Sequence, residues 1–152
     1  MPAPNGLGRR HEALPHTADV GLRAEAPDLP ALFEEAAAAL AELAADVPPG
    51  ARGVERRVER SAVDLEGLAF AWLDELIGLG EAEGSAIGPT TVEAVGEHGG
   101  PEAPWLLRAR VRLVPYGPDG ARPRVGVKSP TYHGLRVEAH LGGWALTAYL
   151  DV

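Results

Sequence analysis

The segment from residue 105 to residue 113 restricts the fold of this chain more than any other feature. Apolar side chains occupy every second position, and arginines fill three of the positions between them: Trp105, Leu107, Ala109, Val111 and Leu113 alternate with Arg108, Arg110 and Arg112. A repeat of two residues is typical of a β-strand with one buried and one solvent-facing side. The segment is therefore the clearest strand of the chain.

Several other segments favour strands. From Asp19 onward, Val20, Leu22 and Ala24 point to one side of a strand, and Asp19 points to the other. A turn at 140–143 precedes a last strand, which runs to the end of the sequence. The remaining strand candidates are 54–60, 90–95, Val125 with Val127, and 135–139.

Two segments have helical spacing. Asp28 suits the N-cap of the first helix, which the 48–50 Pro-Pro-Gly turn should stop. Asp64 suits the N-cap of the second, and Gly78 and Gly80 are expected to end it. The pattern predicts an α+β fold in a single domain, with two helices packed on a mostly antiparallel or mixed β-sheet of about six to seven strands.

Length and composition limit the class of protein. The chain has 152 residues, which fits one domain, and no cysteine, which excludes disulfides, zinc ribbons and thiol nucleophiles. Residues 1–10 are rich in Pro, Gly and Arg and are expected to form a disordered tail before a domain at 11–152. Without an apolar leader or membrane span, a cytoplasmic protein is expected.

The formal net charge is -8. Proteins that bind nucleic acid directly usually carry a basic face, because phosphate contacts supply much of their affinity. No direct nucleic-acid binding and no membrane partner are therefore expected. An acidic chain of this kind instead suits docking on a basic partner or holding cations.

The end of the sequence places two carboxyl groups side by side. Asp151 is followed by Val152, so an α-carboxylate is expected one residue from a side-chain carboxylate, at the end of an apolar strand. Two anions held together need a positive neighbour, which a hard cation with oxygen ligands or an arginine would provide. The alternative is a solvated terminal aspartate.

Asp19 faces away from the buried row of its strand, as Asp151 does in the last strand. If the two strands are neighbours, the carboxylates can meet. His16, three residues before Asp19, would then be a hydrogen-bond donor behind the site, or an ordinary loop histidine.

A dense polar run at 128–134 interrupts the strand region. It contains Lys128, the only lysine of the chain, together with Tyr132 and His133. The Ser129-Pro130 pair should break the strand ladder, because proline cannot donate to it. The three side chains suit a phosphate or an acidic group of a partner, but also an ordinary bulged strand and turn.

Four blocks together resemble the archease family, in the same order and over nearly the whole of 11–152. They are the HTAD stretch of residues 16–19, the WLDEL core of the second helix at 72–76, the VKSPTYHGL run of 127–135 and the final W-x5-LDV of 144–152. The sequence contains no phosphate-binding glycine loop and none of the GxSxG, HExxH or EF-hand motifs. It therefore does not favour a stand-alone enzyme.

The resemblance implies an activator, not an enzyme, that serves an RtcB-type RNA-splicing ligase in tRNA processing. Such an activator promotes guanylylation and multiple turnover of its ligase. It also implies a divalent metal ion, Ca2+ or Mg2+, held by Asp19, Asp151 and the terminal Val152. The motif lysine of the family becomes Lys128, and its helix aspartate becomes Asp64.

The chain departs from the family pattern in two stretches. Residues 116–124 lack a Glu and a His that the family usually carries there, and residues 79–84 differ from the usual FDTEG. Two other functions remain open: a stand-alone metal-dependent hydrolase with His16 or His133 as its base, and a metal-free protein-interaction module.

Overall fold

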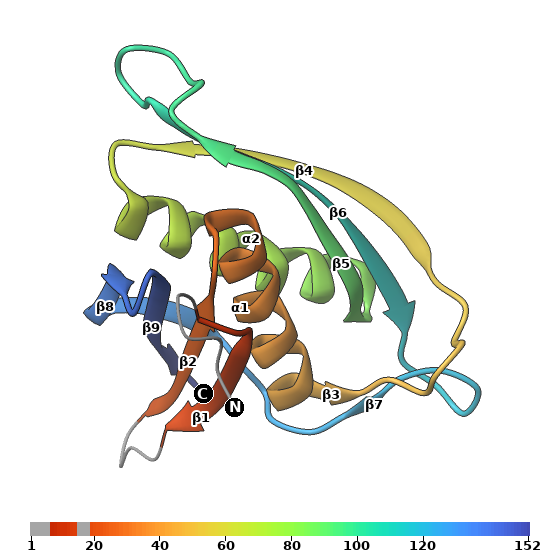
Figure 1. The fold of residues 1–152 in the computed structure, drawn as a ribbon. Coiled ribbons are helices and arrows are strands. Elements are labelled where there is room, and N and C mark those ends of the chain that lie inside the picture. The colour runs from red at the N-terminus through yellow and green to blue at the C-terminus, as the bar shows by residue number, and fades with distance from the viewer. Residues whose placement is uncertain (1–6, 15–18) are drawn as a thin grey trace.

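Two β-sheets enclose a pair of α-helices in a computed structural model that describes residues 7–14 and 19–152 (Figure 1). The elements follow in the order β1 (Arg10–Leu14), β2 (Asp19–Ala26), α1 (Leu29–Ala44), β3 (Ala45–Asp46), β4 (Val54–Ala62), α2 (Leu65–Glu83), β5 (Ser85–Gly96), β6 (Trp105–Pro115), β7 (Arg122–Pro123), β8 (Ser129–His140) and β9 (Gly143–Asp151). The expected α+β class with two helices and mostly antiparallel strands is confirmed for the described residues.

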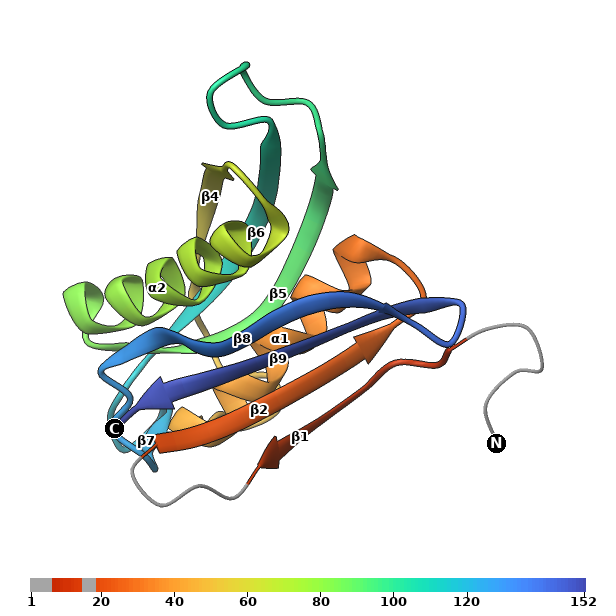
Figure 2. The same ribbon diagram turned by 90° about the vertical axis from the view of Figure 1, so that its left-hand side faces the viewer.

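The strands are divided among separate sheets. The larger sheet has the order β1-β2-β9-β8 and the second has β4-β6-β5, while β3 and β7 form a short pair. Both helices contact strands of both larger sheets, so the helices form the middle layer, and one face of each sheet is left uncovered by helices (Figures 1 and 2). Neither helix of the described residues has the length and apolar character needed to cross a membrane.

Both helices begin at the expected aspartates. The N–H of Ala31 donates to the Asp28 carboxylate at 2.9 Å, and the N–H of Gly67 donates to the Asp64 carboxylate at 2.7 Å. These bonds satisfy main-chain donors that a helix leaves open in its first turn.

The ends of the helices differ from the expectation. The first helix stops at Ala44, before the Pro-Pro-Gly turn, because Ala45 is extended and pairs with β7. The second continues through Gly78 and Gly80 to Glu83. A glycine inside a helix costs only about 1 kcal/mol, whereas Gly84 adopts a left-handed conformation with φ 57° and ends the helix.

The core lies on both sides of the helices. Trp72 of α2 is fully buried, and its indole N–H donates to the main-chain oxygen of Phe33 in α1 at 2.9 Å. The alternation in β6 is confirmed, because Leu107, Val111 and Leu113 are buried while the arginines between them face outward.

Two strand expectations in the second half were wrong. Val125 lies outside the named strands, and its N–H donates to Leu43 at the end of α1. Pro130 does not break the ladder but lies inside β8, opposite Leu150. Because β8 is the outer strand of its sheet, it has only one neighbour there, and a proline without a donor is tolerated.

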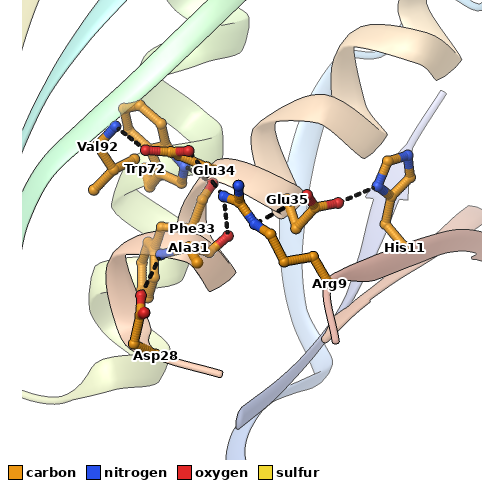
Figure 3. A network of polar contacts seen from close by, with 9 residues as sticks. All are labelled: Arg9, His11, Asp28, Ala31, Phe33, Glu34, Glu35, Trp72 and Val92. Carbon is orange, nitrogen blue, oxygen red and sulfur yellow. Dashed lines mark hydrogen bonds and ion pairs between the residues drawn. The ribbon is translucent and has the colours of Figure 1, made fainter. Parts of the chain in front are cut away.

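Residues 7–14 also belong to the fold, although residues 1–10 were assigned to a tail. Leu7 is buried, and Arg10 begins β1. Figure 3 shows how α1 holds this segment: Arg9 pairs with Glu34 at 2.8 Å, and the His11 ring lies 2.6 Å from Glu35. The other ring nitrogen of His11 lies 2.8 Å from Glu42, so a protonated ring joins β1 to α1 through two carboxylates.

The His11 contacts predict a pH-dependent stability. Burial disfavours the charged ring, but the hydrogen bonds to Glu35 and Glu42 outweigh it and raise the pKa of His11 above 6.5. The charged ring therefore stabilises the fold fully below about pH 6.5, and this contribution is lost as the pH rises through the raised value. A His11→Gln variant should be less stable than the wild type at pH 6 by no more than about 1 kcal/mol, and the gap should close at alkaline pH.

Urea unfolding at several pH values measures this difference. His98→Gln is the matched control, since His98 is exposed and forms no ion pair with the described residues. A stability gap for His11→Gln that stays constant from pH 6 to alkaline pH would contradict the assignment.

Candidate functional site

The pairing of β2 with β9 places two aspartates directly opposite each other. Asp19 is the cross-strand partner of Asp151, and Figure 2 shows the end of β9 beside the start of β2. Directly paired residues of antiparallel strands point to the same face, with Cβ atoms roughly 5 Å apart. The expectation that these two strands are neighbours is confirmed, and both carboxylates lie on the sheet face that turns away from the helices.

The two carboxylates have no ion-pair partner among the described residues. Asp19 is half-buried and Asp151 is exposed, and neither forms an ion pair or side-chain hydrogen bond within 7–14 and 19–152. Like charges directly opposite each other destabilise a sheet. The acid pair, meaning Asp19 and Asp151, therefore forms an anionic spot that favours a cation from outside.

The nearest arginine on this face of β2 is used elsewhere. Arg23 donates to the Thr147 hydroxyl at 3.0 Å and pairs with Glu25 at 3.1 Å. Lys128 lies beside the acid pair through its main chain, whose N–H donates to the Asp151 carbonyl at 2.8 Å. The Lys128 side chain is exposed, so it is available to a partner.

The donor set of the acid pair suits a hard divalent cation only in part. Calcium takes six to eight oxygen ligands and magnesium about six, and the described residues contain no group of three or more His, Cys, Asp or Glu that could hold a metal ion. Two carboxylates would need further oxygen ligands. Val152 follows β9 directly and is exposed, and its contribution of a terminal carboxylate stays a prediction.

Two histidines, His16 and His133, were candidates for roles near the acid pair. His16 lies outside the described residues. His133 is exposed in an irregular part of β8, where five steps from Thr131 to Arg136 face only two steps along β9. Its main-chain oxygen accepts from the Thr131 hydroxyl at 3.4 Å, and its role stays a prediction.

Asp64 is not brought to the acid pair. Glu66, in the same first turn of α2, accepts the Val137 N–H at 3.0 Å. Val137 lies opposite Leu146, which is five residues before Asp151 along β9, and five strand residues cover roughly 17 Å. The carboxylate of Asp64 caps α2 at this distant end, and its role towards a partner stays a prediction.

Sequence reasoning missed a tyrosine and two glycines beside the acid pair. Tyr149 lies on the same face of β9 as Asp151, with Gly21 as its partner in β2. A Cβ on Gly21 would lie 2.9 Å from the tyrosine ring, and one on Gly134 of β8 would lie 2.7 Å from it. A glycine inside a strand often marks such a close approach, so the signal was present in the sequence.

A hollow of about 690 Å3 lies away from all of these residues. It is bordered by α1, the 46–51 turn and β5, and none of the predicted site residues lines it. The acid pair is thus an open surface feature at the end of a sheet rather than the floor of this hollow.

Comparisons with known proteins agree with the resemblance in the motifs. The family described as "Archease protein family (MTH1598/TM1083)" matches residues 11–152. A protein archease of Methanosarcina mazei is 30% identical over 95% of this chain and 97% of its own length. One of Thermococcus gammatolerans is 34% identical over 86% of this chain and 89% of its own length.

Solved structures give the same picture. Protein 1598 of Methanobacterium thermoautotrophicum has a TM-score of 0.74 and 28% identity, over 93% of this chain and 98% of its own. A Thermotoga maritima protein described as an archease and possible chaperone has a TM-score of 0.62 over 93% of this chain and 96% of its own. At 19% identity, the second similarity shows the fold alone.

The capping role of Asp64 can be tested by its effect on stability. Asp64→Ala removes the acceptor of the Gly67 N–H and should lower the free energy of unfolding by about 1 kcal/mol, whereas Asp64→Ser keeps an acceptor and should stay within a few tenths. Denaturant unfolding measures both variants. Equal stability of Asp64→Ala and the wild type would contradict the capping role.

Proposed function

The chain belongs to the archease family, and on this premise we propose that it is a cytoplasmic, cation-binding activator of an RtcB-type RNA-splicing ligase. The observation that carries the proposal is the acid pair. Asp19 and Asp151 face each other on an open sheet face without a neutralising side chain among the described residues. A protein gains no stability from such an arrangement alone, so a function supplied by an external cation accounts for it.

Three residues would hold the cation. Asp19 and Asp151 supply one carboxylate each, and the terminal carboxylate of Val152 supplies a third oxygen group. Ca2+ and Mg2+ both prefer such oxygen ligands. When bound, a divalent ion supplies positive charge that organises a nucleotide triphosphate, which is the charge that guanylylation of a ligase requires.

The position of the pair suits an ion that is shared with a partner. Asp151 is exposed and lies at the end of β9, where a second protein can approach. The exposed Lys128 is fixed beside it by the main-chain bond to Asp151 and would contact a phosphate or an acidic group of the ligase. His16, His133 and Asp64 are proposed as further partner contacts.

An activator fits these residues better than a stand-alone hydrolase. Hydrolysis needs a base within hydrogen-bond reach of the attacked water and a site that excludes bulk solvent. Among the described residues no histidine contacts the acid pair, and Asp151 is exposed to solvent. The arrangement therefore supports an ion used in a reaction on the partner.

Removing either carboxylate should abolish activation without loss of the fold. We expect Asp19→Asn and Asp151→Asn each to lower the stimulation of multiple-turnover ligation at least about tenfold, as loss of one of the three carboxylate ligands should. In metal-free buffer both variants should be as stable as the wild type or more stable by up to roughly 1 kcal/mol, because the repulsion is relieved. Reconstituted ligation under limiting metal and thermal unfolding measure the two effects.

Asp74→Asn is the matched control, since Asp74 of α2 is exposed and forms no ion pair with any described residue. Undiminished stimulation by both site variants would contradict the proposal. Ester or phosphate hydrolysis by the protein alone would favour the hydrolase, and stimulation without any cation binding in calorimetry would favour a metal-free interaction module.

A further inference from the structure

The outer face of β2 offers an internal partner for the acid pair. Asp19, Gly21 and Arg23 follow each other on this face. Arg23 lies four positions along the strand from Asp19, which is about 13 Å between Cα atoms. An extended arginine and an aspartate side chain cover most of that distance, and Gly21 between them has no side chain to obstruct the guanidinium.

The ring of Tyr149 occupies the space above this glycine. A Cβ added to Gly21 would lie 2.9 Å from Cε1 and 3.1 Å from Cδ1 of the ring. On the opposite side, a Cβ on Gly134 would lie 2.7 Å from Cε2 and 2.9 Å from Cδ2. The ring therefore lies between two positions without side chains, and any larger residue at either one would displace it.

The irregularity of β8 produces one side of this slot. Gly134 adopts φ 74°, a left-handed conformation that side chains disfavour, within the stretch where β8 has more residues than β9. The bulged stretch thus brings a glycine, rather than a side chain, against the ring. The slot, defined as Gly21, Tyr149 and Gly134, is built from three neighbouring strands.

Arg23 is held on the far side of the slot. Its guanidinium bonds to Glu25 and to the Thr147 hydroxyl. Glu25 is almost buried and also pairs with Arg10 and His140, both at 3.4 Å. Arg23 therefore shares one carboxylate with Arg10 and the His140 ring, whereas Asp19 on the same strand and Asp151 on β9 form no ion pair with the described residues.

We propose that Tyr149 keeps the acid pair available to a metal ion by holding the Arg23 side chain away from it. The ring blocks the path over Gly21, so the charge that neutralises Asp19 and Asp151 comes from a metal ion and not from the protein's own arginine. This inference rests on the proposed cation site and assigns Tyr149 as its positioning residue. Gly21 and Gly134 hold the ring in place.

A double-mutant cycle tests the inference. Calorimetric titration with Ca2+ and with Mg2+ should show at least about fivefold weaker binding to Tyr149→Leu, because Arg23 then reaches the acid pair and competes. Adding Arg23→Gln to Tyr149→Leu should return the affinity to within about twofold of Arg23→Gln alone. Tyr149→Phe keeps the ring and should bind like the wild type.

Arg108→Gln is the matched control for the change in net charge. Arg108 pairs with Glu59 at 3.3 Å on the other sheet, so Tyr149→Leu combined with Arg108→Gln should stay weak. Tyr149→Met is the second variant if Tyr149→Leu does not fold. In the absence of metal, the NMR resonance of the Arg23 Nε–H should shift in the tyrosine variant, and Asp19→Asn should reverse that shift.

The outcomes separate this inference from the proposed function. Tight cation binding by the wild type and equally tight binding by Tyr149→Leu would overturn the inference and leave the cation site intact. Weak binding that Arg23→Gln does not restore would also overturn it, because the ring would then act as a ligand or only as packing. A wild type that binds neither ion would overturn the proposed function and the inference together.

Discussion

The pairing of β2 with β9 is the interaction on which the rest of the structure depends. It joins a strand near the start of the described chain to the last strand, and these two form the centre of the larger sheet. Its register sends Leu22, Ala148 and Leu150 into the core and Asp19 and Asp151 to the opposite face. A slip of one residue would exchange the two faces, so the apolar row that buries the strands also forces two carboxylates together.

On both sides of the middle layer, a glutamate of a helix accepts a main-chain N–H of an outer strand. Glu34 of α1 accepts the Val92 N–H of β5 at 2.8 Å, and Glu66 of α2 accepts the Val137 N–H of β8 at 3.0 Å. Both strands are outer strands, whose open N–H groups would otherwise invite pairing with another chain. Glu34 also forms an ion pair with Arg9 (Figure 3). It therefore links the N-terminal segment, a helix and the second sheet.

Local periodicity was sufficient to predict much of this arrangement. The alternation of 105–113 and of 144–150 gave β6 and β9, and the capping aspartates gave the starts of both helices. The strand β1 was missed because contacts of Arg9 and His11 with a distant helix hold its segment in place, and these have no local pattern. The end of α2 was misplaced because a glycine stops a helix through its conformation, which composition does not reveal.

In the site, too, local pattern predicted some features, and others depend on contacts between distant segments. Asp19 and Asp151 could be paired from the sequence because both lie on outer positions of strands that turned out to be neighbours. Asp64 was assigned from the same family resemblance but lies near the far end of β8, so a shared resemblance does not imply a common place in the fold. The slot of Gly21, Tyr149 and Gly134 could not be predicted, because it depends on a bulge and on the register of three strands. Several arginines elsewhere have glutamate partners, such as Arg56 with Glu83 and Arg60 with Glu75. The acid pair differs from such pairs because its two carboxylates oppose each other across neighbouring strands, and the proposed cation would relieve that repulsion from outside the fold.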